Sequence, residues 1–203
     1  MSSIELIVES NLSSEEENIL TSIANIKYKL PLINSLVIEI EEENIDKLKS
    51  LKCLKTVFQN THITMQMDSA RDIVNANMAQ EKGYTGKGIG IAILDTGISP
   101  INDFLYPKNR IIAFKDFING KTNPYDDNGH GTHVSGIAGG NGVNSNGKYK
   151  GIAIDCNFIG VKVLNKEGKG NASDVLAGLQ WIVDNKEKYN IKIINLSIGT
   201  NNT

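Results

Sequence analysis

Two of the chain's three histidines lie in one short stretch, residues 126–140, which reads DDNGHGTHVSGIAGG. His130 and His133 are three residues apart, and most of their neighbours are small. A histidine in such a setting can be a metal ligand, a packed structural residue or a catalytic base. The rest of the chain has to decide between these roles.

The two histidines predict different roles. A zinc site could use two histidines at this spacing, but the usual helical zinc motif has a glutamate between them, and no third ligand is evident. His133 is followed by Val134 and Ile137, which favours a packed structural histidine. His130 has a glycine on each side, so other chain segments and a substrate can approach it closely. These neighbours favour His130 as the catalytic base.

Asp95 is the natural partner for such a base. It directly follows the apolar run GIGIAIL at residues 88–94, so we expect it at the carboxyl end of a buried parallel strand, where open α/β sheets place functional groups. A buried carboxylate would stabilise the imidazolium that a helix N-terminus disfavours. A turn-capping role for Asp95 remains the alternative. The stretch LDTG also resembles an aspartic protease loop, but that chemistry needs two such carboxylates and no second Asp-Thr-Gly occurs.

The elements around these residues predict a parallel α/β sheet. Apolar strands are expected at 88–95, 157–164 and 191–199, and helices at 72–83, after His130 and at 173–189. Strands that are apolar throughout and alternate with helices indicate a sheet covered on both faces. The segment GKGIG at 86–90 resembles a phosphate-binding loop, but it precedes a strand instead of following one, so it is expected to be a turn.

Residues 2–66 show a different pattern of predicted elements, in which short strands and helices alternate. Strands are expected at 4–10, 26–33, 35–41 and 54–59, with helices at 13–24 and 44–51. The first helix should begin with a capping box, because Glu16 follows Ser13 by three residues. The resulting order βαββαβ is the ferredoxin-like arrangement, which by itself says nothing about function.

Composition limits the possible partners and the compartment. A chain of 203 residues with 40% hydrophobic and 22% charged residues is typical of a soluble globular protein. The net charge of −2 argues against nucleic acid, and no apolar run is long enough to span a membrane. The start MSSIELIVES is not a secretory signal, so we expect a cytoplasmic protein in which Cys53 and Cys156 are buried free thiols.

Four segments together resemble successive motifs of the subtilases, the subtilisin-type serine proteases. They are AILDTGI (92–98), DDNGHGTHVSGIAGG (126–140), GVKVLNKEGKGNASDVLAGLQWI (160–182) and IINLSIGT (193–200). They follow one another in the family's order and cover most of residues 70–200. The stretch IIAFKDFINGKTNPYDDNGHGTH at 111–133 is similar to intracellular alkaline subtilases, which agrees with a cytoplasmic location.

The resemblance implies roles for individual residues. Asp95 matches the aspartate that orients the base, His130 matches the general base, and His133 matches a second, non-catalytic histidine. Two edge segments would hold an extended peptide or protein substrate between them: Gly168, Lys169 and Gly170 on one side, and Ser197, Ile198 and Gly199 on the other. Lys169 could favour acidic substrate residues, although a solvated lysine is the simpler interpretation.

The resemblance also implies a division of the chain. Residues 1–66 are similar to the prodomain that assists folding of many subtilases and inhibits them with its tail. Residues 67–203 match the amino-terminal part of the peptidase domain. The expected fold class is therefore α/β, with a ferredoxin-like βαββαβ prodomain followed by the first part of a subtilisin-like parallel-sheet domain. We expect the maturation site within residues 60–67.

The sequence departs from the family at the nucleophile and at a calcium loop. In subtilisin the order is Asp, His, Ser, yet no Gly-Thr-Ser-Met-like motif and no oxyanion-hole asparagine segment follow His130, so the chain is expected to be truncated and inactive alone. The chemistry requires no cofactor or catalytic metal. Structural calcium stays open: the loop at 139–151 has no carboxylate, although Gln66 and Asp103 could supply oxygens. The alternative to a serine endopeptidase is a non-catalytic protein that binds a peptide or inhibits a protease.

Overall fold

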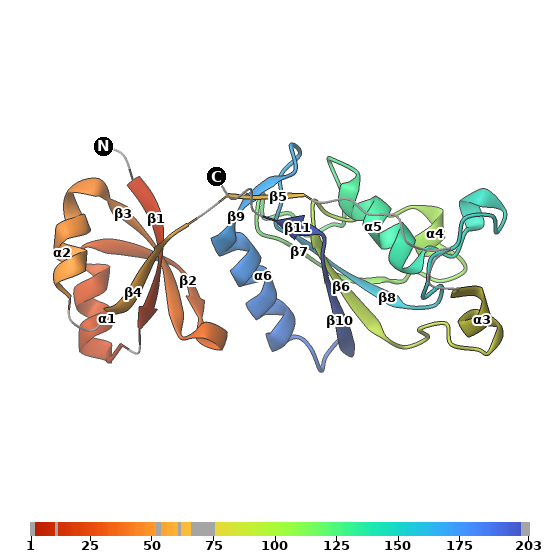
Figure 1. The fold of residues 1–203 in the computed structure, drawn as a ribbon, viewed down its shortest axis with the longest axis horizontal. Coiled ribbons are helices and arrows are strands. Elements are labelled where there is room, and N and C mark those ends of the chain that lie inside the picture. Colours follow the sequence, from red (N-terminus) through yellow and green to blue (C-terminus); the bar gives the residue numbers. More distant parts are fainter. Residues whose placement is uncertain (1–2, 11, 52–53, 61, 66–75, 200–203) are drawn as a thin grey trace.

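The computed structural model describes residues 3–10, 12–51, 54–60, 62–65 and 76–199 (Figure 1). For Ser10 and residues 62–65 it describes the backbone only. These residues form a four-stranded antiparallel sheet, a four-stranded parallel sheet and a three-stranded sheet that joins distant segments.

The amino-terminal unit, residues 3–60, has the predicted order βαββαβ. Its strands lie side by side in the order β2-β3-β1-β4. Its elements are β1 (Ser3–Ser10), α1 (Ser14–Thr21), β2 (Ala24–Leu30), η1 (Pro31–Ile33), β3 (Ser35–Glu41), η2 (Glu42–Asn44), α2 (Ile45–Ser50) and β4 (Leu54–Gln59). Helices α1 and α2 cover one face of the sheet through Leu20 and Leu48, which pack with inward residues of β1 and β3.

The start of α1 confirms the predicted capping box. The Ser13 hydroxyl accepts a hydrogen bond from the Glu16 amide (3.3 Å), and the Glu16 carboxylate accepts one from the Ser13 amide (2.8 Å). Each satisfies a backbone donor that the first helical turn leaves unpaired.

The predicted strand at 26–33 is wrong at its end. Strand β2 stops at Leu30, and Pro31–Ile33 form a short 3-10 helix that ends at Asn34 in the left-handed region (φ 49°). Pro31 has no amide proton to donate to the neighbouring strand β3, so the ladder cannot continue through it.

The parallel sheet has the strand order β10-β6-β8-β7. The elements after residue 75 are α3 (Ala76–Glu81), β6 (Gly90–Asp95), α4 (Asn102–Leu105), β7 (Ile111–Asp116), α5 (His130–Gly139), η3 (Val143–Ser145), β8 (Asn157–Lys162), β9 (Lys169–Asn171), α6 (Ala172–Asp184), β10 (Ile191–Leu196) and β11 (Ile198–Gly199). The predicted parallel α/β sheet is confirmed, although strand β7 was not predicted as a strand.

None of the described helices has the length and apolar character needed to cross a membrane.

Two predicted elements differ at their carboxyl ends. Helix α6 ends at Asp184 and not at residue 189, because its apolar stripe stops at Val183 and charged residues follow. The strand expected at 191–199 is divided: β10 belongs to the parallel sheet, whereas β11 pairs in the three-stranded sheet.

Side chains alternate along the central strands, so each face of the parallel sheet has its own core. Ile91, Ile93 and Phe158 face α5, while Leu94 and Val161 face α6. The predicted free thiol of Cys156 lies in the α5-side core, and burial raises its pKa to about 11. Cys53 lies outside the described residues.

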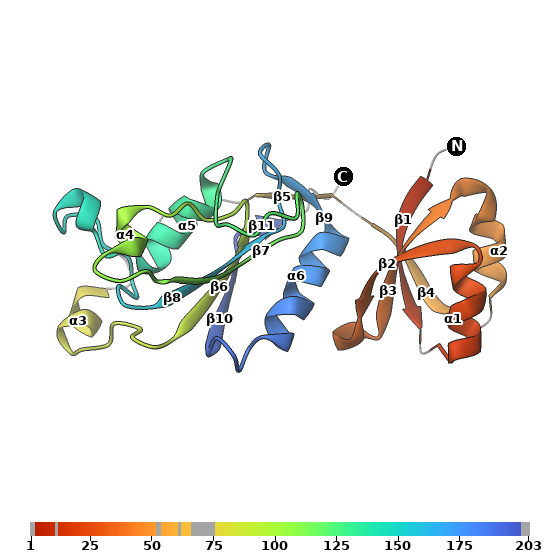
Figure 2. The ribbon, with the colours of Figure 1, turned by 180° about the vertical axis from the view of Figure 1, so that it is seen from behind.

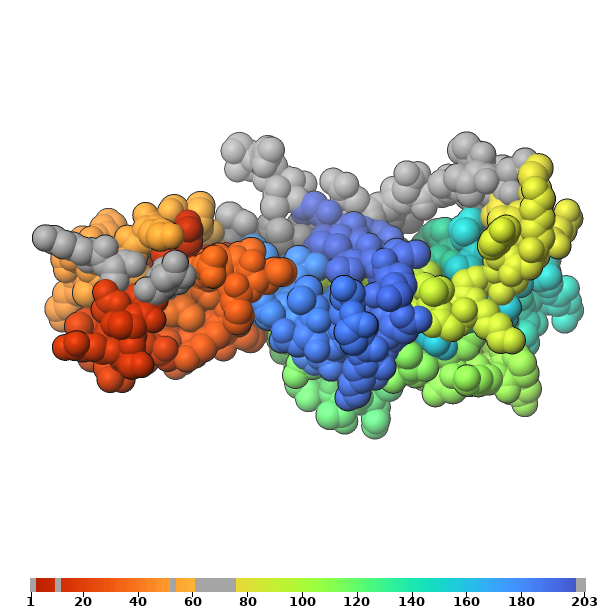
Figure 3. Space-filling model, turned by 90° about the horizontal axis from the view of Figure 1, so that it is seen from below, coloured from red at the N-terminus to blue at the C-terminus, as the bar shows by residue number. Residues whose placement is uncertain are grey.

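Helix α6 lies between the two four-stranded sheets, as Figures 1 and 2 show from opposite sides. Val175 and Ile182 pack on the parallel sheet, whereas Ala177 and Leu176 pack with Val37 on the antiparallel sheet. In the space-filling view of Figure 3, the orange amino-terminal unit meets the blue part of the chain that contains α6. Helix α6 therefore packs against both four-stranded sheets.

Candidate active site

The site begins at the carboxyl end of β6, a strand whose six residues are all buried. Its last residue, Asp95, is completely buried, and the chain turns sharply after it through Gly97 (φ 130°). A side chain at Gly97 would lie 2.1 Å from the Tyr125 carbonyl oxygen, so only glycine fits this turn. The turn brings the loop before α5 against the end of β6.

The structure brings Asp95 and His130 together. His130 is the first residue of α5, only 7% of it is exposed, and its Nδ1 lies 2.7 Å from Oδ1 of Asp95. Gly131 permits this approach, because an added Cβ there would lie 2.2 Å from the Gly97 carbonyl oxygen. The pair that the sequence predicted is therefore within hydrogen-bonding distance.

The environment of Asp95 decides what the pair can do. Burial raises the pKa of the Asp95 carboxyl, and hydrogen bonds from His130 and from the Thr96 amide (2.7 Å) oppose that rise. When Asp95 is ionised it accepts the proton on Nδ1 of His130, which leaves Nε2 as the basic nitrogen. The geometry suits a general base whose ring is oriented by a buried carboxylate.

A second aspartate, which the sequence interpretation missed, connects the strand end to the helix start. Asp126 Oδ1 accepts hydrogen bonds from the Thr96 hydroxyl (2.8 Å) and the Gly129 amide (2.9 Å). Its Oδ2 accepts from the amide (2.9 Å) and hydroxyl (2.6 Å) of Thr132. Burial alone would raise the Asp126 pKa, but these hydrogen bonds outweigh it and lower the pKa. The available signal was an aspartate just before a predicted helix start.

The two predicted edge segments meet in the three-stranded sheet β11-β5-β9, at the carboxyl ends of the parallel strands (Figure 1). Its middle strand is β5 (His62–Met65), which runs antiparallel to both neighbours. On one side β5 pairs with β9, and on the other with β11. The register pairs Thr64 with Lys169 and Gly199, Ile63 with Gly170, and Met65 with Ile198.

The remaining predicted edge residues lie outside this ladder. Gly168 (φ 73°) forms the turn before β9, and Ser197 separates β10 from β11, where its hydroxyl accepts a hydrogen bond from Asn195 (2.9 Å). Lys169 is exposed, as a solvated lysine should be. Gly170 is needed for packing, because an added Cβ would lie 2.2 Å from the Val163 carbonyl oxygen.

The prediction for His133 is wrong. Its side chain is exposed and lines a hollow of about 600 Å³ together with Ile137 and Tyr149. Helix α5 buries His130, Gly131, Ser135 and Gly139, whereas position 133 faces away from the sheet.

The loop after α5 was the predicted candidate for structural calcium. Oδ1 of Asp103 accepts a hydrogen bond from the Asn144 amide (2.6 Å), so the loop is attached to Asp103 directly. No group of three or more His, Cys, Asp or Glu side chains that could hold a metal ion occurs within residues 3–10, 12–51, 54–60, 62–65 and 76–199. Gln66, the other predicted oxygen donor, falls outside these ranges.

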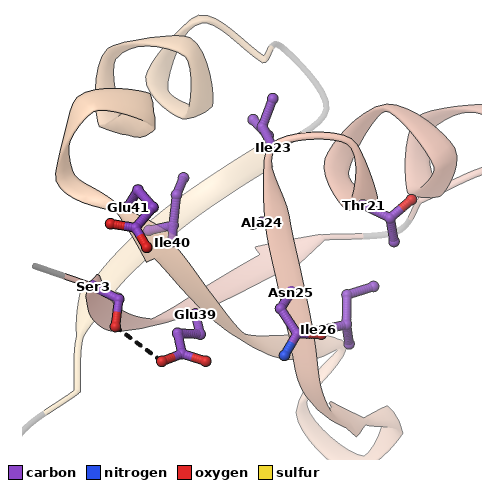
Figure 4. Close-up of a pocket in the computed structure, with 9 residues that line it drawn as sticks. All are labelled: Ser3, Thr21, Ile23, Ala24, Asn25, Ile26, Glu39, Ile40 and Glu41. Carbon is purple, nitrogen blue, oxygen red and sulfur yellow. Dashed lines mark hydrogen bonds between the residues drawn. The ribbon is translucent and has the colours of Figure 1, made fainter. Parts of the chain in front are cut away.

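A further pocket, of about 480 Å³, lies in the amino-terminal unit (Figure 4). Its wall contains Glu39, which accepts a hydrogen bond from Ser3 (2.9 Å), and Glu41 from the same strand. The lining contains no histidine, cysteine or lysine. Its two glutamates have no histidine beside them, so the site at Asp95 and His130 is the stronger candidate.

Known proteins resemble this chain over most of its length. Residues 86–203 match the Subtilase family. Serine protease AprX of Bacillus subtilis (strain 168) is 38% identical over 184 residues, which are 87% of this chain and 40% of that protein.

Two further relatives agree with this match. The thermostable alkaline protease of Halalkalibacterium halodurans is 30% identical over 95% of this chain and 50% of its own length. Alkaline elastase YaB of Bacillus sp. (strain YaB) is 31% identical over 95% of this chain and 48% of its own. The chain thus spans half or less of the length of these relatives.

Proposed function

The chain belongs to the subtilase family, and from this premise we propose that Asp95 and His130 are the orienting carboxylate and the general base of a subtilisin-type serine endopeptidase. The observation that carries the proposal is the contact of 2.7 Å between two buried side chains at the junction of β6 and α5. In this mechanism Nε2 of His130 takes the proton of a serine hydroxyl as that oxygen attacks the peptide carbonyl. The same nitrogen then gives the proton to the leaving amine, and water later hydrolyses the acyl-enzyme.

The mechanism also needs the serine. No Gly-Thr-Ser-Met-like motif occurs in these 203 residues, so we propose that turnover requires a further part of the protein. Strand β10 supports this, because it is an edge strand on which Ile193, Ile194 and Leu196 are 50%, 39% and 42% exposed. An apolar edge of this kind favours pairing with another strand.

We propose that the substrate is an extended peptide held between β9 and β11. Strand β5 supports this arrangement, because a segment of the chain pairs there with Lys169 and Gly170 on one side and with Ile198 and Gly199 on the other. Main-chain hydrogen bonds would hold a substrate in the same way and leave its side chains to determine specificity.

The proposal extends to the amino-terminal unit, for which we retain the prodomain assignment at residues 1–66, with the peptidase part at 67–203. A prodomain should occupy the substrate cleft and dock beside it. Strand β5 (His62–Met65) lies near the end of residues 1–66 and takes the middle position of the three-stranded ladder between β9 and β11. The cytoplasmic location remains a prediction within this proposal.

The docking surface supports a specific interaction. At the start of α6, the Asn60 side chain accepts a hydrogen bond from the Ser173 amide (2.9 Å) and donates one to Glu5 (2.7 Å). Tyr28 donates to the buried Asp174 (2.9 Å), and Lys27 bridges Glu5 (2.5 Å) and Asp174 (4.0 Å). Such a matched set of polar partners at a partly buried interface fixes orientation.

A second candidate function is binding without catalysis. The observation that favours it is the ladder itself, because β9 and β11 hold an extended segment without any contribution from a serine nucleophile. A protein of this kind would bind a peptide or a protease and release it unchanged.

A fluorophosphonate probe and casein hydrolysis distinguish the two functions. We expect neither labelling nor hydrolysis with the 203 residues alone, and both with the protein read on to its natural stop codon. In that longer form His130→Ala should abolish both signals, because base removal in subtilisin costs about a million-fold in kcat. The matched control His133→Ala should retain them, because His133 is exposed and is not the histidine that contacts Asp95. Casein hydrolysis that survives His130→Ala, or a longer form that binds peptide without labelling, would refute the protease proposal.

A further inference from the structure

Lys162 is a completely buried lysine at the carboxyl end of β8. Its ammonium donates to the Thr96 carbonyl oxygen (2.5 Å), to the Leu164 carbonyl oxygen (2.8 Å) and to Oδ1 of Asp127 (2.6 Å). All three of its donor protons thus have an acceptor.

The three acceptors come from three segments of the candidate active site. Thr96 follows Asp95, Asp127 lies three residues before His130, and Leu164 begins the connection from β8 to the cleft strand β9. Lys162 thus contacts both the turn after Asp95 and the loop before His130.

The sheet register explains how a lysine reaches this place. Lys162 is paired with Asp95 across the parallel strands β8 and β6, and paired residues in a parallel ladder face the same side. That side is the one covered by α5, which begins with His130.

Packing alone does not account for a lysine here. A buried ammonium loses its hydration, and an apolar side chain such as methionine could fill the same space without that loss. Lysine stems commonly carry the charge out to water, yet here the side chain is 0% exposed while its partner Asp127 is 36% exposed. The position therefore keeps a positive charge inside the site.

We propose that Lys162 is a positioning residue for the Asp95–His130 pair. Its ammonium fixes the turn after Asp95 relative to the loop before His130, and so holds the two side chains at their 2.7 Å contact. The inference rests on the proposed function, but it concerns a property that can be measured without turnover.

The test uses the NMR signal of the Nδ1 proton of His130 in the 203-residue chain, because the rate at which this proton exchanges with water reports how firmly Asp95 holds the ring. The chain has three histidines, so the His130 signals are assigned with the variants His62→Gln and His133→Gln. Lys162→Met removes the charge and keeps the length of the side chain. Lys162→Arg keeps the charge, and Lys115→Met removes an exposed lysine from the neighbouring strand β7 as the matched control.

We expect Lys162→Met to speed the exchange of that proton with water about fivefold or more, because the turn after Asp95 loses its hydrogen-bonded link to the loop before His130. Lys162→Arg should restore slow exchange at least in part, and Lys115→Met should leave the exchange rate unchanged. Asp127→Asn removes one of the three acceptors and should speed the exchange by a smaller factor than Lys162→Met.

Two results would overturn the proposal. One is a folded Lys162→Met chain in which the Nδ1 proton of His130 exchanges as slowly as before. If Lys162→Met does not fold, Asp127→Asn decides, and an unchanged exchange rate in that variant refutes the positioning role. A failure here leaves the protease proposal standing, because the latter depends on labelling and hydrolysis by the longer form.

Discussion

Gly131 offers the sharpest test of how α5 is held against β6. An added Cβ at this position would lie 2.2 Å from the Gly97 carbonyl oxygen and 3.0 Å from the Asp95 Cβ. Carbon–oxygen contacts of this kind normally stop near about 3.3 Å, so the helix would have to move by about 1 Å. The carbonyl cannot yield, because Gly97 is itself confined against the Tyr125 backbone.

The same helix supplies a matched control in Gly136, where an added Cβ has no neighbour within 4 Å. Replacing a helical glycine by alanine gains about 0.5–1 kcal/mol where nothing obstructs the new methyl group. Gly136→Ala should therefore stabilise the chain by that amount. Gly131→Ala has the same propensity gain, but the steric overlap costs about 1–3 kcal/mol or more.

We expect the two variants to differ by about 1–3 kcal/mol, with Gly131→Ala the less stable. For a chain of this size each kcal/mol shifts Tm by about 2–4 °C, so thermal unfolding should separate them by about 2–12 °C. In Gly131→Ala the displaced helix should also weaken the 2.7 Å contact between His130 and Asp95. Its Nδ1 proton should then exchange faster with water and disappear from the NMR spectrum. Equal Tm values for the two variants, with that proton retained in both, would refute the steric argument.

Three further predictions concern the pair, the docking surface and the cleft. In the longer form, Asp95→Asn should lower kcat about 10⁴-fold because it favours the wrong tautomer of His130; steady-state kinetics showing less than a tenfold loss would contradict that role. Burial raises the pKa of Glu5, but hydrogen bonds and the charge of Lys27 outweigh it, so the pKa of Glu5 is lowered. The contribution of Glu5 to the free energy of unfolding is therefore fully present above the ordinary glutamate pKa. It is lost as the pH falls through the lowered pKa. Lys27→Met should remove about 1 kcal/mol of the free energy that holds the amino-terminal unit against α6. At pH 7 the backbone amides of α6 should then exchange with solvent about fivefold faster, and unchanged exchange would argue against the contact. The longer form should mature directly after the paired residues of β5, and mass spectrometry of its new amino terminus should find Gln66 or Met67 and not a residue before His62.

Regular patterning made most of the fold predictable. The capping box at Ser13, the alternation in β3 and the continuous apolar run of β6 each follow from local residue types. Asp95 and His130 could be paired because a strand end and a glycine-flanked helix start are recognisable one at a time. Their separation of 35 residues was bridged by the chemical argument that the base needs a buried carboxylate, and the family resemblance supported the same pairing.

The features that escaped prediction depend on contacts between distant segments. Strand β7 is only partly buried at the edge of the sheet, so its residues lack the continuous apolar run that marked β6. His133 was assigned from its apolar neighbours in sequence, yet its exposure depends on which face α5 turns to the sheet. The role of Lys162 needs acceptors from three segments, and only its presence in an otherwise apolar strand could have suggested it.

The geometry at Asn60 links the amino-terminal unit to the cleft. Its side chain caps the start of α6 through the Ser173 amide, and α6 follows directly from β9, one edge of the cleft. Two residues after Asn60 the chain enters β5, which pairs with that same edge at Asn171. A single residue therefore fixes both the helix behind the cleft and the point at which the extended segment enters it. Loss of this cap should loosen the edge and the segment together, so we expect docking of the unit and occupation of the proposed cleft to be one cooperative event.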